Sequence, residues 1–161
     1  MTVDAVEEPF RTQFTVRLRD GDTLLGVALP APCTFTTGNG VDILWMGPDE
    51  YLVLGPALSR ESADLEGALS RESVVLAVVD VSCQRNVVRL TGEHARDVLA
   101  HGCSIDLDPA VSPPGTCVQT LFARTGIVLM VREEGFTILV RQSFANYFAA
   151  WLADASLEYV S

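Results

Sequence analysis

The residues best suited to chemistry gather in residues 80–107, near the middle of the chain. This stretch holds both histidines, His94 and His101, and two of the four cysteines, Cys83 and Cys103. A cysteine thiolate with a histidine as its base is a common pair in nucleophilic catalysis. Cysteine and histidine are also the preferred ligands of zinc. This stretch is therefore the first place to look for an active site or a metal centre.

The spacing of these side chains argues against both kinds of site. His94 and His101 lie about two turns apart on a predicted helix, whereas helical metal ligands prefer a spacing of four residues. Cys103 follows the end of that helix, where the negative end of the helix dipole should raise a thiol pKa. Cys83 lies in a predicted bulge beside Arg85, a slightly better environment for a thiolate. We expect histidines at the boundary of the core and ordinary unreactive thiols.

Known catalytic and metal-binding motifs are missing from the sequence. No CxxC pair occurs, and neither does GxGxxG, GxxxxGK[ST], HExxH or GxSxG. Asp106 and Asp108 precede Pro109 and are typical of a turn. We therefore expect no catalytic residue, no metal site and no cofactor held by this chain.

The composition and net charge of the chain disfavour some classes of binding partner. The chain has 161 residues, of which 48% are hydrophobic, enough for one ordinary domain or two small lobes. It has 11 basic and 21 acidic residues, a net charge of −10, which disfavours nucleic acid and anionic membranes as partners. The longest apolar runs are of strand length, and the acidic N-terminus does not look like a secretory signal. We expect a cytoplasmic protein with reduced thiols.

The beginning of the chain gives three local signals. Residues 1–13 are predicted as a loose N-terminal arm. Residues 14–19 alternate apolar and polar side chains, which indicates a half-buried strand. Residues 23–29 are predicted as a short helix that Pro30 stops.

Two later stretches resemble each other. Residues 41–70 and residues 127–155 each predict a strand, a tight acidic turn, a second strand and a helix. Short turns force antiparallel pairing of the strands that they join. We therefore predict an α+β fold with antiparallel sheets and packed helices: one domain over residues 14–161, made of two similar halves, about 14–72 and 73–161.

The last predicted helix has two distinct faces. Its apolar residues recur at helical spacing and predict a core face: Phe144, Tyr147, Phe148, Trp151, Leu152 and Ala155. The opposite face carries almost no charge and consists of Asn146, Ala149, Ala150 and Ala153. Alanine is a good helix former, which is one explanation. The other is that a second lobe or another subunit covers this face.

Several segments together resemble the gamma subunits of heterotetrameric sarcosine oxidases. They are LLGVALPAP, ILWMGPDEYLVLGP, VDVSCQRNVVRLTGEHARDVLAHGCSIDLDP, PPGTCVQTLF and LVRQSFANYFAAWLADAS. They span most of residues 24–156. Any one of these segments alone would be a weak signal, but their combination is fairly specific.

The resemblance implies a fold and a role. The family is related to the folate-binding domain of the glycine cleavage T-protein, which suits two α+β halves. It implies alpha and beta subunits as partners, with FAD, FMN, NAD and tetrahydrofolate bound there. It also implies a non-catalytic subunit that takes part, through assembly, in sarcosine catabolism, the oxidative demethylation of sarcosine to glycine.

A second interpretation stays open beside the first. A T-protein-like chain could instead be a stand-alone protein that binds a folate-like small molecule. Arg85, Arg89 and Arg124 could then hold the carboxylates of such a ligand.

Overall fold

The fold consists of two compact units, each with its own antiparallel sheet and hydrophobic core. A computed structural model describes residues 3–57 and 59–159. Unit 2 is Pro9–Gln84, and unit 1 contains the described residues on either side of it, 3–8 and 85–159. No helix among the described residues is long and apolar enough to cross a bilayer.

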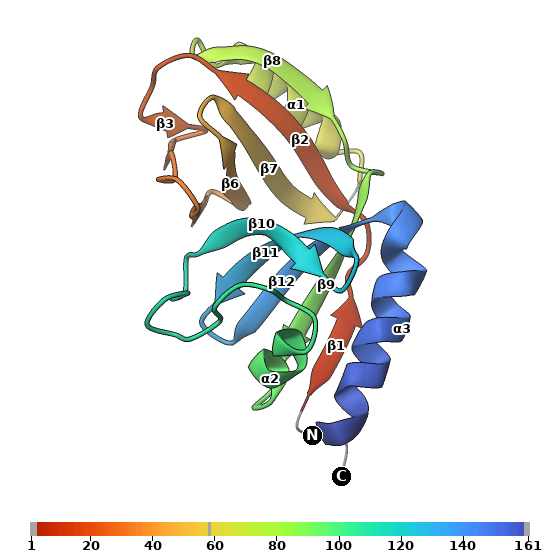
Figure 1. The fold of residues 1–161 in the computed structure, drawn as a ribbon. Coiled ribbons are helices and arrows are strands. Elements are labelled where there is room, and N and C mark those ends of the chain that lie inside the picture. Colours follow the sequence, from red (N-terminus) through yellow and green to blue (C-terminus); the bar gives the residue numbers. More distant parts are fainter. Residues whose placement is uncertain (1–2, 58, 160–161) are drawn as a thin grey trace. The chain divides into compact units, whose positions relative to one another are not determined.

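Unit 2 is a five-stranded sheet with one helix. The strands follow the order β5-β6-β7-β2-β8 and are antiparallel throughout: β5 (Phe35–Gly38), β6 (Val41–Gly47), β7 (Glu50–Ala57), β2 (Arg11–Leu18) and β8 (Val75–Asp80). Helix α1 (Ser62–Arg71) contacts β7 and β8 (Figure 1). Its Leu69 enters a core that also contains Phe14, Val16 and Val53. The helix is therefore held by the apolar face of the sheet.

Unit 1 is a second five-stranded sheet with two helices. Its strands follow the order β1-β9-β12-β11-β10: β1 (Asp4–Glu7), β9 (Arg85–Thr91), β12 (Gly135–Arg141), β11 (Thr125–Arg132) and β10 (Cys117–Phe122). Helix α2 (Ala95–Ala100) contacts α3 (Ala145–Ser156), and both contact β12. In Figure 1, α3 runs along this sheet, between the short helical turns η1 (Gln142–Phe144) and η2 (Leu157–Tyr159).

One face of the unit 1 sheet forms the main core. Leu90, Leu129 and Ile138 point to that face and are fully buried against helical residues that include Leu99 and Phe148. Side chains alternate between the two faces of a strand, so Val87, Val128 and Leu139 point to the opposite face. That opposite face carries the candidate site described below.

The two sheets have corresponding strand orders. β6, β7 and α1 in unit 2 occupy the same places as β11, β12 and α3 in unit 1. The two sheets differ in the origin of one edge strand. In unit 2 this strand is β8, which follows α1 and pairs with β2. In unit 1 the N-terminal strand β1 pairs with β9 in that place. The division between units consequently falls after Gln84 and not near residue 72.

Two local predictions are wrong. The predicted loose arm, residues 1–13, contains β1 and the start of β2, because Asp4–Glu7 finds a distant partner in β9 that no local pattern reveals. Residues 23–29 form the two-stranded pair β3 (Thr23–Leu24) and β4 (Val27–Ala28) and not a helix. Leu25 and Gly26 adopt positive φ values of 52° and 73°, which make a turn.

Candidate functional site

The two histidines lie around one tyrosine at the end of the chain. His94 Nδ1 is 2.8 Å from Asp97 Oδ2, and the His94 ring stacks on Tyr159 with 4.9 Å between ring centroids. His101 Nε2 is 3.2 Å from the Tyr159 hydroxyl oxygen. Both side chains are partly exposed, as expected of histidines at the boundary of the core. Their contacts fix η2 against the end of α2.

The cysteines do not form a site with these histidines. Cys83 is exposed in the turn before β9, whereas Cys103 is partly buried and Cys117 fully so. Burial removes the Cys103 thiol from water and raises its pKa to about 11. The sequence predicted a raised pKa as well, but from the helix dipole. Within the described residues, no group of three His, Cys, Asp or Glu side chains could hold a metal ion.

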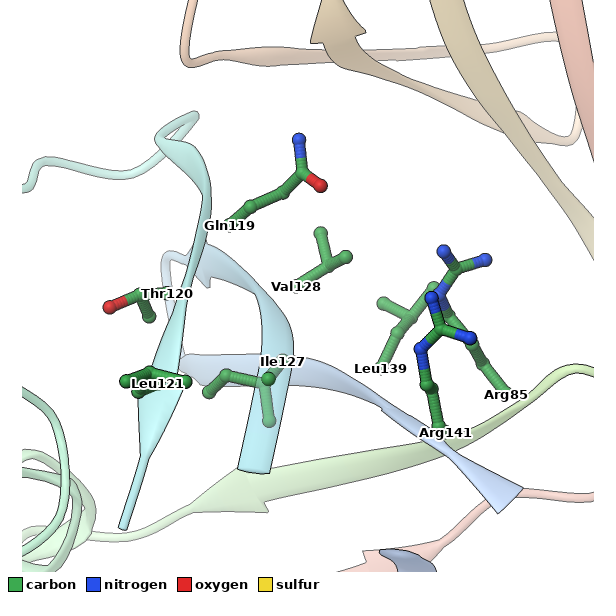
Figure 2. Close-up of a pocket in the computed structure, with 9 residues that line it drawn as sticks. Arg85, Gln119, Thr120, Leu121, Ile127, Val128, Leu139 and Arg141 are labelled. Atoms are coloured by element: carbon green, nitrogen blue, oxygen red, sulfur yellow. The ribbon is translucent and has the colours of Figure 1, made fainter. Parts of the chain in front are cut away.

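A hollow on the unit 1 sheet brings together the side chains with the clearest binding chemistry. Its volume is about 380 Å³. Arg85, Arg141, Gln119 and Thr120 supply its polar lining, and Leu121, Ile127, Val128 and Leu139 supply most of the apolar lining. Figure 2 shows the two guanidinium groups side by side at one end, with the Gln119 amide across from them. We name this hollow the arginine pocket.

Sheet register explains why these residues meet. Arg85 begins β9 and Arg141 ends β12, and the two are directly opposite in the antiparallel ladder. Residues opposite each other point to the same face of a sheet. Leu139 lies two residues before Arg141 in β12. It pairs with Val128, and Val128 pairs with Gln119. The row from Gln119 to Leu139 therefore crosses the sheet beside the arginine pair.

A glycine creates the hollow itself. Gly126 pairs with Leu121, and continuing the β11–β12 register places Gly126 opposite Arg141. A Cβ atom added to Gly126 would meet nothing within 4 Å. The row that runs from Leu121 to the arginines thus lacks one side chain, which leaves open space at Gly126.

The electrostatics of the arginine pocket favour an anion. Two guanidiniums on neighbouring strands repel each other. No carboxylate in the described part of the chain lies within ion-pair distance of Arg141. Among the described residues, the lining contains no histidine, cysteine or acid, and Thr120 supplies a hydroxyl group.

Sequence reasoning found only part of this pocket. It selected Arg85 as a ligand for carboxylates, but Arg89 and Arg124, named with it, do not line the hollow. It missed Arg141 and Gln119. Their only signal in the sequence is the alternation of side chains within β12 and β10, which says nothing about which strands are neighbours.

The predicted partner-facing surface of α3 is exposed in the chain. Asn146, Ala149, Ala150 and Ala153 all lie on the outside of the helix. Ala149 and Ala153 also line a second hollow of about 260 Å³, between α3 and strands β1, β9 and β12. Asn86 borders it, where its Nδ2 donates to Glu7 while its Oδ1 is buried without a hydrogen-bond partner.

The predicted core face of α3 is partly wrong. Phe148, Leu152 and Ala155 are buried, but Phe144 and Tyr147 are 45% and 38% exposed. Phe144 belongs to the preceding turn η1 and not to α3, so its side chain does not follow the helical spacing of the core face. Exposed aromatic surface therefore remains at the start of α3, outside the unit 1 core.

Comparisons with known proteins all point to one family. The model of the sarcosine oxidase gamma subunit family matches residues 16–158. A sarcosine oxidase subunit gamma from Corynebacterium sp. (strain P-1) is 33% identical over 170 residues, covering 99% of this chain and 83% of that relative. The subunit gamma from Arthrobacter sp is 32% identical over 165 residues, covering 96% and 80%.

A solved structure supports the same relationship. A chain of the heterotetrameric sarcosine oxidase from Corynebacterium sp. U-96, in complex with pyrrole 2-carboxylate, superposes with a TM-score of 0.84 at 32% sequence identity. The match covers 99% of this chain and 86% of that chain. The similarity thus extends over both units.

Proposed function

The chain belongs to the sarcosine oxidase gamma subunit family, and on that premise we propose that it is the gamma subunit of a heterotetrameric sarcosine oxidase. Its partners are the alpha and beta subunits of that complex. The observation that carries this proposal is the match of nearly the whole chain, in sequence and in fold, to a chain of the solved complex. The named relatives are subunits, which favours this role over that of a stand-alone folate-like binding protein.

The chain contributes to the assembly of the complex, and the alpha and beta subunits catalyse the reaction. The complex oxidatively demethylates sarcosine to glycine in the cytoplasm, with FAD, FMN, NAD and tetrahydrofolate bound to the alpha and beta subunits. Two features support this division. The candidate nucleophiles Cys83 and Cys103 lack a histidine partner, and Cys103 has a raised pKa. Among the described residues, the lining of the arginine pocket also contains no histidine, cysteine or carboxylate.

The two units are repeats of one T-protein-like half. The corresponding strand orders of the two sheets support this, as does the recurrence of hairpin and helix in β6–β7–α1 and β11–β12–α3. N-terminal strand β1 then replaces, in unit 1, the edge strand that β8 supplies in unit 2. In this proposal the chain keeps the scaffold of a folate-binding relative without its catalytic role.

The exposed face of α3 meets a partner subunit. Asn146, Ala149, Ala150 and Ala153 give it a surface almost without charge, although the chain as a whole is acidic. Phe144 and Tyr147 add exposed aromatic surface at the start of the helix. Charge-depleted, aromatic-rich surface is typical of the centre of an interface.

Co-production of the subunits tests the proposal. The alpha and beta subunits of the same host are produced with and without this chain, and the yield of soluble flavin-containing complex is measured. We expect the chain to co-purify with both subunits and to raise that yield. An alpha–beta enzyme that forms equally well without the chain, and does not bind it when it is added, would overturn the proposal.

A further inference from the structure

We propose that a hollow at one end of the unit 2 sheet is a binding site for an alkylammonium group. The hollow has a volume of about 310 Å³, and its polar lining includes Asp20, Asp22 and Tyr51. We name it the acidic hollow. The inference concerns unit 2 alone and goes beyond the role in assembly, because it gives this chain a ligand chemistry of its own.

Three segments of unit 2 surround the acidic hollow. β2 ends at Leu18, and residues 19–22 lead from it to β3 (Figure 1). The Leu18 amide donates to the Asp49 carbonyl oxygen at 3.0 Å, which ties the turn between β6 and β7 to the end of β2. The Leu29 amide donates to the Asp22 carbonyl oxygen at 2.9 Å, which ties the segment after β4 to the same loop. Hydrogen bonds within the unit therefore fix the backbone around the hollow.

Tyr51 supplies the observation that points to a ligand. Its ring belongs to the unit 2 core, and only 9% of the residue is exposed. Its hydroxyl has no hydrogen-bond partner among residues 3–57 and 59–159. Buried tyrosines normally satisfy this group. The hydroxyl is not enclosed by the core, and Tyr51 lines the acidic hollow, so a group bound in the hollow can supply the missing partner.

The charges of the acidic hollow select a cation. Asp20 and Asp22 are exposed, and neither has a basic side chain within ion-pair distance in the described part of the chain. Asp49 also lines the hollow, but its Oδ1 is paired with Arg17 Nη1 at 2.6 Å. Arg19 is the basic residue among the described lining residues. The two unpaired carboxylates outnumber this one guanidinium, so the local potential is negative.

The acceptors of the hollow match an ammonium group in number and kind. An alkylammonium has three N–H donors and no acceptor, whereas a carboxylate only accepts and a tyrosine hydroxyl can accept. Two carboxylates and one hydroxyl thus offer one acceptor group for each donor. A metal ion is a poorer match, because no group of three His, Cys, Asp or Glu among the described residues could hold one. The volume of about 310 Å³ leaves room for the attached carbon chain.

The ammonium group could belong to a free amine or to a lysine side chain of a partner subunit. The chemistry of recognition is the same in both cases. A partner's lysine would fill the hollow once the complex has formed, whereas a free amine needs the hollow to stay open there. Only this distinction rests on the proposed function.

A titration with n-butylammonium chloride tests the site. Backbone amide signals of the full ¹⁵N-labelled chain are followed by NMR. Sodium chloride at the same ionic strength controls for screening, and butan-1-ol controls for the carbon chain. We expect saturable shifts at Asp20, Gly21 and Asp22 with butylammonium alone. The double variant Asp20→Asn/Asp22→Asn should weaken binding at least about fivefold, because two charged contacts become neutral.

Three further variants separate a built site from general attraction to an acidic surface. Tyr51→Phe keeps the ring and every charge but removes the hydroxyl, and it should weaken binding about threefold. Arg19→Gln removes the like charge from the lining and should tighten binding about twofold. Asp64→Asn changes an exposed aspartate of α1 outside the hollow and should leave binding unchanged. Should Tyr51→Phe fail to fold, the double variant and Asp64→Asn still decide, because asparagine keeps the turn preference of aspartate.

Each outcome decides the proposal. Saturable butylammonium binding to both the chain and the purified complex supports a free amine as the ligand. Binding to the chain but not to the complex supports a lysine of a partner subunit in the hollow. Lack of saturable binding in the chain, equal shifts from sodium chloride, a folded Tyr51→Phe variant that binds as tightly as the wild type, or equal effects of the double variant and Asp64→Asn would overturn the proposal. The titrations of the chain do not depend on whether it assembles with alpha and beta subunits.

Discussion

At the scale of single residues, the surroundings of a side chain decide its chemistry more than its type does. Cys83 and Cys103 lie in the stretch that first suggested an active site, but one is exposed in a turn and the other is partly buried. His94 and His101 stand near Cys103 in the sequence, but their side chains contact Asp97, Tyr159 and Glu158. The residues that form a usable pocket are arginines and a glycine.

Thiol alkylation tests the environment of Cys103. Burial raises its pKa from an ordinary 9.0 to about 11, so at pH 8 its thiolate fraction is about a hundredfold lower than that of an unperturbed thiol. Iodoacetamide followed by peptide mass spectrometry should therefore modify the exposed Cys33 and Cys83 first. Because the thiolate is the nucleophile, the Cys103 rate should rise about tenfold per pH unit between pH 8 and 10. Equal rates for Cys83 and Cys103 at pH 8 would contradict this account.

Gly135 should resist substitution. Its φ is +128°, and a Cβ atom there would collide with the Leu90 carbonyl oxygen of neighbouring strand β9. Gly135→Ala should therefore lower the free energy of unfolding by about 2 kcal/mol or more, measured by urea denaturation. Gly126→Ala, where the added Cβ meets nothing, should change stability by less than about 1 kcal/mol. Similar losses in the two variants would show that the backbone at Gly135 is not constrained as described.

At the scale of elements, the sequence predicts local structure and misses distant pairing. The hairpin strands β6–β7 and β11–β12 and helix α3 follow from alternation, tight turns and helical spacing. Strand β1 was not predicted because Asp4–Glu7 forms a strand only by pairing with β9. The β3–β4 turn was missed because Leu25, which is not a glycine, adopts a positive φ.

The candidate site was hard to predict for the same reason. Arg85 and Arg141 lie far apart in the chain, and only the β9–β12 register makes them neighbours. The hollow depends on the missing side chain of Gly126 in β11. A single sequence contains each of these residues but not the order of the strands, so the pocket could not be assembled from it.

A charge on α3 tests the role of that helix. Ala149→Glu puts a carboxylate on the charge-depleted face beside the α3 hollow. The exposed position can hydrate the new charge in the isolated chain, so its melting temperature should change little, whereas a buried unpaired charge in an interface costs several kcal/mol. Affinity for the alpha and beta subunits should fall at least about tenfold in a titration by mass photometry.

Ala63→Glu is the matched control for that variant, because Ala63 is an exposed alanine of α1 in unit 2. It should leave affinity unchanged. Equal affinity for the Ala149→Glu and wild-type chains would mean that this face of α3 points to solvent in the complex.

At the scale of the whole molecule, the chain combines two five-stranded sheets with exposed apolar surface on and beside α3. Phe144, Tyr147 and Leu157 are large exposed hydrophobic residues in or next to α3. Isolated exposed hydrophobic residues are common, but their grouping along one helix with little charge is typical of a surface that another protein covers. Because the chain belongs to the sarcosine oxidase gamma subunit family, we propose that the covering proteins are other subunits of that complex.

Native mass spectrometry of the particle isolated on the tagged chain from its own host is the most direct test of this account. We predict one copy of the 17.4 kDa chain together with larger alpha and beta subunits and bound flavin. The particle should oxidise sarcosine, while the separated chain should not. A chain recovered alone, or only with copies of itself and without flavin, would contradict the central claim that it is a subunit of sarcosine oxidase.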